Sequence, residues 1–322
     1  EDSLWNSIPR ICSRLNNTVF KYSGKRLPVN YSPFKFGSWM GGDRDGNPNV
    51  NHNITNEVIL LSRWEAASLY EKELTNIIQD LSLHECTNEI KKMAGNSQEP
   101  YRVFLRPIRK KFKVTQVEIE KNLIEGKPIN KKLLVNSIDE ILKPLNSVYN
   151  SLCTVKCDAI ANGSTLDLIR RANSFGLNLA KLDIRQEASK HSSLIQKIYK
   201  KLYNKNYFEL TENEKVFFLK KSIQSKKSIF KKKITFNKED KEVWRTFKLL
   251  SEVPRECLGA YIISMASKAS DVLSVMLLQK EAGIKEYLRI VPLFETLQDL
   301  NNSNSIMMQI YENKFYLKTF KK

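Results

Sequence analysis

The sequence predicts a mainly helical chain whose second half forms part of a parallel βα-barrel. Through the first 176 residues, apolar side chains recur at three- and four-residue steps, the spacing of amphipathic helices. From Leu177 onward, helical segments alternate with three short segments that have the pattern of strands. This alternation is typical of a parallel sheet or of a TIM-like barrel. Three strands cannot close an eight-stranded barrel, so we expect an incomplete barrel that the helical half or other chain completes.

Two long helices open the chain. The first is predicted over residues 3–22, and Pro9 is expected to shorten or kink its first turn because proline has no N–H to donate. The second is predicted from a cap at Asn53 or Thr55 to about Leu83. Its apolar side chains form one stripe, which we interpret as core: Leu60, Trp64, Ala67, Leu74, Ile78 and Leu81.

Three more helices are predicted before the pattern changes. They cover residues 99–124, 136–161 and 164–175. Gly163 and Gly176 are expected to end the last two, since glycine readily adopts the left-handed conformation found at helix C termini.

The first strand is predicted between Leu177 and Arg185, where apolar and charged side chains alternate with a period of two. The apolar face holds Ala180, Leu182 and Ile184, and the charged face holds Lys181, Asp183 and Arg185. Two interpretations fit this pattern. The segment is either an edge strand with a solvated charged face or a barrel strand whose charged face lies at the mouth of the barrel.

Helices are predicted next over residues 187–203, 211–225 and 238–251, the middle part being rich in lysine. The segment 258–265 is short, almost wholly apolar and partly β-branched, as expected for a buried parallel strand.

The last helix–strand pair lies between residues 270 and 294. Ser270 is expected to cap the helix and Gly283 to end it. A third strand is predicted over residues 288–294. Pro292 cannot donate a hydrogen bond to a neighbouring strand, so we expect the pairing to end there.

Three polar residues fall at or near the C-terminal ends of the predicted strands: Arg185, Ser264 and Glu295. In a βα-barrel this rim is where active sites are built. An arginine there can bind phosphate or carboxylate through two N–H groups, and a glutamate oxygen suits a hard divalent ion such as Mg²⁺ or Mn²⁺. A lone arginine or glutamate more commonly forms a structural ion pair. The combination favours a site for an anion and a metal.

The loop over residues 34–50 has an unusual composition: three glycines within six residues (37–42), a tryptophan among them and an Asp-Arg-Asp sequence. A solvated turn would explain the glycines but not Trp39 and Met40 beside them, so we interpret the loop as functional. A calcium-binding loop is excluded because the glycine falls at the wrong position and Ile54 replaces the terminal glutamate. The Gly-Lys-Ser/Thr ending of a phosphate-binding P-loop is also absent.

The formal charge is +18, and lysines crowd the stretch between residues 200 and 241. We interpret them as a solvated surface rather than a polyanion-binding patch, because arginines are few and no glycine–aromatic RNA-binding signature is present.

The sequence has no run approaching the ~20 apolar residues of a membrane span. Five irregularly spaced cysteines fit free thiols in a reducing cytosol, and the three histidines have no metal-ligand spacing.

Four segments resemble signature segments of the phosphoenolpyruvate carboxylases, in the order and approximate spacing found in that family. They are Gly37 to Val50, Leu182 to Glu187, Ala260 to Leu273 and Val291 to Leu297. The resemblance runs from Leu4 to about Asn302. It implies a central fragment of a bacterial-type enzyme of the phosphoenolpyruvate-binding superfamily, located in the cytoplasm.

The resemblance also implies roles for individual residues. Glu295 corresponds to a ligand of the divalent metal, Mg²⁺ or Mn²⁺, which an aspartate further along also binds. Arg185 corresponds to a residue that contacts the substrate phosphate. Trp39 and Leu293 correspond to residues lining the pocket for phosphoenolpyruvate and bicarbonate. The family reaction joins these two substrates to give oxaloacetate and phosphate, through carboxyphosphate and an enolate.

Several parts of the family's active site are missing from this sequence. These are the catalytic histidine in a Thr-Ala-His-Pro-Thr-Glu-like segment, the catalytic lysine, the second metal-binding aspartate and a glycine–arginine phosphate loop. No catalytic residue is therefore assigned here, and the chain alone is expected to be inactive. The family's full-length enzyme is a homotetramer, and no nucleic-acid or membrane partner is expected.

We divide the chain into a helical region, 1–176, that carries the loop 34–50, a partial barrel with inserted lysine-rich helices, 177–302, and a truncated or divergent tail, 303–322. Two other interpretations stay open. The chain could be a degraded, non-catalytic product, or a basic helical protein that binds nucleic acid.

Overall fold

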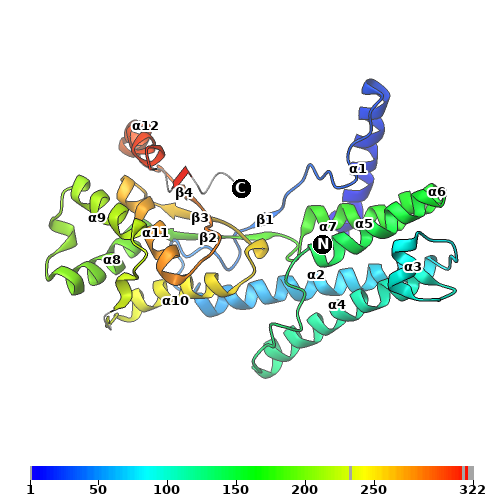
Figure 1. Ribbon diagram of the computed structural model, residues 1–322. Coiled ribbons are helices and arrows are strands. Elements are labelled where there is room, and N and C mark those ends of the chain that lie inside the picture. Colours follow the sequence, from blue (N-terminus) through cyan, green and yellow to red (C-terminus); the bar gives the residue numbers. More distant parts are fainter. Residues whose placement is uncertain (1, 232–233, 314–315, 318–322) are drawn as a thin grey trace. The chain divides into compact units, whose positions relative to one another are not determined.

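A computed structural model of the chain describes residues 2–231, 234–313 and 316–317 (Figure 1). By its internal contacts the chain divides into two compact units. The helical unit comprises Glu1–Phe36 and Ile59–Lys181, and the sheet unit comprises Gly37–Val58 and Leu182–Lys322.

The loop 34–50 belongs, from Gly37 onward, to the sheet unit, whereas the sequence analysis grouped it with the helical region. The cause is a pairing between segments far apart in the sequence. Asp43 forms a parallel bridge with Arg185, so this part of the loop lies beside the first long strand. Sequence order alone does not reveal such a pairing.

All five helices predicted for the helical region are present. The bounds are α1 Asp2–Ser23, α2 His52–Asp80, α4 Pro100–Glu125, α5 Asp139–Thr154 and α7 Leu166–Phe175. A short helix, α3 (Asn88–Ala94), was not predicted. The predicted helix 136–161 was too long, because Lys156 adopts a left-handed φ of 63° that ends α5. The residues after it form α6 (Asp158–Ile160) and the π-helical turn η1 (Ala161–Thr165).

The start of α2 is capped two residues before Asn53 and four before Thr55, the two predicted caps. The side-chain oxygen of Asn51, rather than that of Asn53 or Thr55, accepts hydrogen bonds from the N–H groups of Asn53 (2.9 Å) and Ile54 (3.2 Å). Asparagine is among the preferred N-cap residues because it satisfies N–H groups that have no partner inside the helix.

Aromatic side chains from four helices, α1, α2, α4 and α7, build much of the core of the helical unit. Trp5 contacts Tyr70 and Phe175, with ring centroids 5.3 and 5.1 Å apart, and Tyr70 contacts Phe112 at 5.2 Å. Large aromatic rings contribute strongly to burial, and Trp5 and Tyr70 are 3% and 0% exposed. Pro9 lies within α1, one turn from this cluster, and the helix continues through it.

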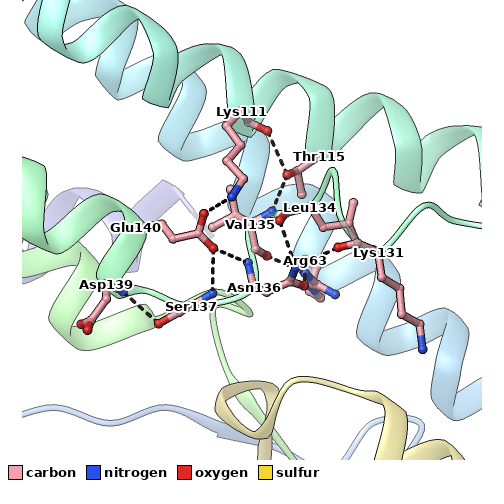
Figure 2. A network of polar contacts seen from close by, with 10 residues as sticks. All are labelled: Arg63, Lys111, Thr115, Lys131, Leu134, Val135, Asn136, Ser137, Asp139 and Glu140. Atoms are coloured by element: carbon pink, nitrogen blue, oxygen red, sulfur yellow. Dashed lines mark hydrogen bonds and ion pairs between the residues drawn. The ribbon is translucent and has the colours of Figure 1, made fainter.

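Figure 2 shows the polar network that fixes the loop between α4 and α5. The buried guanidinium of Arg63 donates to the carbonyl of Val135 (2.7 Å), and the N–H of Val135 donates to the hydroxyl of Thr115 (2.9 Å). Glu140 accepts from the N–H of Asn136 (2.8 Å) and pairs with Lys111. These contacts hold the pKa of the Glu140 carboxyl below its usual value, against the opposing effect of burial.

The sheet unit alternates strands and helices as predicted. Its strands are β1 Gly37–Ser38, β2 Lys181–Glu187, β3 Leu258–Ser264 and β4 Arg289–Pro292. In the described residues they form one sheet of order β1-β2-β3-β4, with β2, β3 and β4 parallel (Figure 1). Strand β4 ends at Pro292, as predicted, although the N–H of Leu293 still donates to the carbonyl of Ile263 on β3 (2.9 Å).

The helices between these strands are α8 Ala188–Tyr203, α9 Glu212–Gln224, α10 Lys238–Glu252, α11 Ala269–Ala282 and α12 Leu297–Tyr311. Short 3₁₀ turns lie at η2 Tyr207–Glu209, η3 Ile229–Lys231 and η4 Arg255–Cys257. The prediction of a mainly helical chain with a parallel βα segment is thus confirmed. Exposed lysines lie on α8, just after it and after α9, and include Lys200, Lys201, Lys205, Lys226 and Lys227.

Two predicted helix ends in this unit can be compared with the structure. Gly283 ends α11 with a left-handed φ of 87°, as expected. Ser270 does not cap α11, because the helix already begins at Ala269 and the Ser270 hydroxyl donates instead to Glu212 (2.8 Å). The carboxylate of Asp271 accepts from the N–H groups of Ser267 and Lys268, both at 3.0 Å, and so closes this end of the helix.

Helix α12 runs across residue 303, where the sequence analysis set the start of a divergent tail. Part of that tail, 314–315 and 318–322, lies outside the described residues.

Within the described part of the chain, no helix is both long and apolar enough to cross a bilayer. No disulfide bond joins the described cysteines, in agreement with the expected thiols.

The core between the sheet and its helices contains a histidine. His191 of α8 is fully buried, and its Nε2 lies 2.8 Å from the hydroxyl of Tyr261 on β3. Phe247 of α10 stacks on Tyr261 with ring centroids 5.1 Å apart. Burial lowers the pKa of His191 to about 3, because the charged imidazolium loses its hydration. His191 is therefore neutral in the folded protein at any pH near neutrality.

We expect His191 to make the protein less stable as the pH falls from about 6.5 towards 3. In this window the unfolded chain protonates the histidine and the folded chain does not, so acid favours unfolding by up to about 1.4 kcal/mol per pH unit. Urea unfolding at pH 7 and pH 5 measures this effect. The variant His191→Gln should lose less stability between the two pH values than the parent, by about 2 kcal/mol. Replacing the exposed His84 by glutamine is the control and should leave the pH dependence unchanged.

Candidate functional site

The sequence-predicted residues Arg185 and Glu295 meet at the C-terminal edge of the sheet. Arg185 Nη2 lies 3.4 Å from Glu295 Oε1 and 2.7 Å from Asp45 Oδ2, and Nη1 lies 3.3 Å from Asp43 Oδ2. The side chain of Arg185 is 20% exposed and the three carboxylates 29–34%, so the group is partly screened from water. The guanidinium is thus oriented by two aspartates from the loop and one glutamate from beyond β4.

The loop reaches Arg185 because its backbone pairs with β2. The N–H of Arg185 donates to the carbonyl of Gly42 (2.9 Å), and the N–H of Arg44 donates to the carbonyl of Arg185 (3.0 Å). Residues 42–44 therefore run beside β2 as an added parallel segment. Asp43 lies between these two bonds, and its carboxylate reaches the Arg185 side chain.

Close approach of this backbone to β2 requires a glycine. A Cβ atom on Gly42 would lie 1.9 Å from the carbonyl oxygen of Asp183, a backbone atom that cannot move aside freely. Gly259 on β3 is equally confined, since its Cβ would lie 2.0 Å from the Asp183 carboxylate. That carboxylate accepts from the N–H of Ala260 (2.6 Å), so it too is fixed.

We expect Gly42→Ala to separate the loop from β2. Relief of the collision requires a backbone shift, and overpacking of this kind costs on the order of 3 kcal/mol. Urea unfolding of the variant should show this loss of stability. Ser38→Ala is the control, because Ser38 lies in the same loop and its hydroxyl makes a single long hydrogen bond within the described residues, accepting from the N–H of Met40 at 3.3 Å. Equal stability of Gly42→Ala and the parent would contradict the close approach.

A buried arginine, Arg44, fixes the loop through hydrogen bonds to its backbone and to α2. Arg44 is 9% exposed and donates to the carbonyl of Gly42 (2.9 Å) and the hydroxyl of Thr55 (2.5 Å). Thr55, at the start of α2, donates in turn to the carbonyl of Gly41 (2.7 Å). Burial lowers the pKa of Arg44, with nearby Tyr261, Glu242 and Asp43 opposing the shift. The sequence analysis noted the Asp-Arg-Asp pattern but missed that its arginine is structural and its aspartates face the site.

The second carboxylate oxygen of Glu295 is also fixed. Oε2 accepts from the N–H of Met265 (2.8 Å), the residue that follows β3. Met265 has a left-handed φ of 53°, which is uncommon for a residue other than glycine and costs on the order of 1 kcal/mol. Such outliers tend to occur at functional sites. No pattern in the sequence marks this residue, since methionine has no preference for that conformation.

The other sequence-predicted residues lie nearby with different roles. The ring centroid of Trp39 is 5.6 Å from the guanidinium carbon of Arg185, and the side chain is 48% exposed. Leu293 continues the line of β4, with its N–H donating to Ile263 (2.9 Å) and its carbonyl accepting from Ala266 (3.2 Å). Ser264 does not reach the site, because it is fully buried and its hydroxyl has no partner among the described residues.

Counting formal charges, Arg185 and its three carboxylate partners carry two negative charges in excess. Such a group would repel a phosphate unless a cation were bound with it. Glu295 is suitable as one ligand of a hard divalent ion. However, no group of three or more His, Cys, Asp and Glu side chains in the described residues is arranged to hold a metal. A metal at Glu295 would therefore require further oxygen ligands from outside this set.

Comparison with known proteins agrees with the resemblance seen in the sequence. A family model described as phosphoenolpyruvate carboxylase matches residues 1–322. Curated proteins named phosphoenolpyruvate carboxylase are similar to the chain, at 43% identity for that of Acinetobacter baumannii, 40% for Aliivibrio salmonicida and 41% for Klebsiella pneumoniae. Each match covers 98% of this chain and 36% of the relative, so the chain spans about a third of their length. The family match continues to residue 322, past Asn302, where the sequence analysis expected the resemblance to fade.

Proposed function

Because the chain belongs to the phosphoenolpyruvate carboxylase family, we propose that it supplies part of an active site that joins bicarbonate to phosphoenolpyruvate, giving oxaloacetate and phosphate. The observation that carries the proposal is the meeting of Arg185, Glu295 and the Trp39 loop at one edge of the parallel sheet. We propose further that β2, β3 and β4 are consecutive strands of a barrel, since active sites of such folds lie at this edge.

Arg185 is the proposed phosphate ligand. Its guanidinium has a rigid planar fork, and Asp43 and Asp45 hold that fork in one orientation. The 3.4 Å contact with Glu295 is the longest of its three ion pairs and is the one that a phosphate oxygen would replace. Pre-orientation by the aspartates lowers the entropy lost when phosphate binds. The excess negative charge of the group explains why phosphate would bind only together with a cation.

Glu295 is the proposed metal ligand, with Mg²⁺ or Mn²⁺ as the ion. The bound ion would supply positive charge to an enolate oxygen as negative charge develops there. Within this chain, Met265 fixes one carboxylate oxygen through its N–H, which leaves the other oxygen to exchange Arg185 for the metal. Ligands held in advance need little reorganisation during the reaction.

Trp39 and Leu293 are the proposed walls of the substrate pocket. The half-exposed ring of Trp39 beside Arg185 would shield the site from water once substrate covers it. Exclusion of water strengthens the electrostatic contacts inside and protects a reactive enolate from protonation. We propose a cytoplasmic location for this chemistry, consistent with the thiols of the chain.

A chimeric enzyme tests the proposed function. Residues 1–322 replace the matching segment of the Acinetobacter baumannii relative, to which they are 43% identical. The chimera should form oxaloacetate in a reaction that requires phosphoenolpyruvate, bicarbonate and a divalent metal. The relative with the segment deleted is the control and should be inactive. A chimera that folds, by circular dichroism and gel filtration, but forms no oxaloacetate would contradict the proposal.

A further inference from the structure

The helical unit contains a cavity of about 550 Å³ that the proposed reaction does not use. It is bounded by α1, the segment that follows α1, and the region from α5 to α7. Every residue that lines it belongs to the helical unit. The volume falls within the range of small-molecule sites, ~300–1,000 Å³.

Arg170 of α7 contributes a buried guanidinium to the lining. The residue is 9% exposed, and its Nη1 donates to the carbonyl of Pro9 (3.3 Å) and lies 3.5 Å from Asp167. No acceptor among the described residues binds its Nη2. Nη2 is not among the buried polar atoms that lack a partner, so it is open to the cavity, where an acceptor from outside the chain can bind it.

Arg26 lies on the same cavity and is held in place without a carboxylate. Its guanidinium carbon lies 4.6 Å from the ring centroid of Phe20, a cation–π contact that orients the side chain. Among the described residues no aspartate or glutamate forms an ion pair with it. Arg26 therefore presents an oriented and uncompensated positive charge.

Amide groups add further donors. The side-chain oxygen of Asn16 accepts from the N–H of Leu27 (2.9 Å), which leaves its NH₂ group as a donor on the lining. Asp158 is the one carboxylate on the lining that the structure describes. Burial, and after it the neighbouring Asp158 carboxylate, raise the pKa of the Cys153 thiol. Two guanidinium groups therefore outnumber one carboxylate on the lining.

We propose that this cavity binds a small anion bearing a carboxylate or phosphate group, with Arg26 and Arg170 as its principal ligands. Guanidinium groups whose N–H groups are not all bound within the chain are suited to such anions, because a guanidinium can donate two parallel hydrogen bonds to oxygen atoms. Neither residue belongs to the site around Arg185, so the cavity is a separate binding site.

Isothermal titration of the 322-residue chain with inorganic phosphate and, separately, with malonate tests the proposal, at constant ionic strength in chloride. Saturable binding of one or both anions is expected, and the two titrations distinguish phosphate from carboxylate. Arg26→Gln should weaken binding at least tenfold without altering thermal stability in chloride. Arg170→Gln should weaken it further, but this buried residue also supports Pro9, so Arg26→Gln carries the test.

Two further variants separate this site from others. Arg14→Gln removes one positive charge from the exposed surface of α1, away from the lining, and should leave binding unchanged. Arg185→Ala should also leave it unchanged, because the proposed substrate site lies elsewhere. Absence of saturable binding, equal effects of Arg26→Gln and Arg14→Gln, or loss of binding only in Arg185→Ala would each overturn the proposal.

Discussion

Replacing Arg185 by alanine in the chimeric enzyme is expected to raise the KM for phosphoenolpyruvate and to lower kcat/KM about 1,000-fold. A bidentate arginine–phosphate contact and the charge that develops on the substrate are both lost, at about 1.4 kcal/mol for each tenfold change. The three carboxylates would also lose their shared cation. Asp43, Asp45 and Glu295 would then repel one another and repel the substrate. Steady-state kinetics with varied phosphoenolpyruvate measure the effect.

Arg185→Lys is the informative second variant. Lysine keeps the positive charge but cannot contact Asp43, Asp45 and a phosphate in the plane of one fork. We expect it to recover less than a tenth of the lost kcat/KM. Arg289→Ala is the matched control, since Arg289 is an exposed arginine at the opposite end of β4. If Arg185→Ala showed the parent KM for phosphoenolpyruvate, the phosphate role would be wrong.

The elements that the sequence predicted are those with a regular local pattern. The helix over residues 3–22 was recognised because its apolar residues recur every three to four positions. The strand that ends near Arg185 was recognised because its apolar residues recur at every second position. The meeting of Arg185 and Glu295 was also predicted. It follows from parallel strands alone, because their C-terminal ends lie along one edge of the sheet.

The features that the sequence did not predict depend on contacts between distant segments. The loop joins the sheet unit because Gly42 tolerates the carbonyl of Asp183 at close range, and no local pattern encodes that approach. For the same reason Asp43 and Asp45 were not assigned to Arg185. The left-handed conformation of Met265 is a third case, and its N–H binds Glu295, thirty residues further along the chain.

Glu295→Gln is expected to weaken Mn²⁺ binding in the chimera about 100-fold, equivalent to about 2.7 kcal/mol. Glutamine has the same shape and keeps an oxygen to accept the N–H of Met265, so the site should stay folded. It lacks the negative charge that a hard divalent ion requires from its ligand. Direct Mn²⁺ titration followed by electron paramagnetic resonance measures binding independently of turnover, and activity assays then give the metal concentration for half-maximal rate.

Two comparisons make this result specific to Glu295. Glu187→Gln alters another carboxylate at the end of a strand, one that accepts from the hydroxyl of Ser189 (2.6 Å), and should leave the Mn²⁺ titration unchanged. Glu295→Asp keeps the charge but shortens the side chain, so it should lie between the parent and Glu295→Gln. An identical Mn²⁺ titration for Glu295→Gln and the parent would mean that Glu295 only pairs with Arg185. In that case its removal should instead alter the KM for phosphoenolpyruvate at saturating metal, because Arg185 would lose one of its three partners.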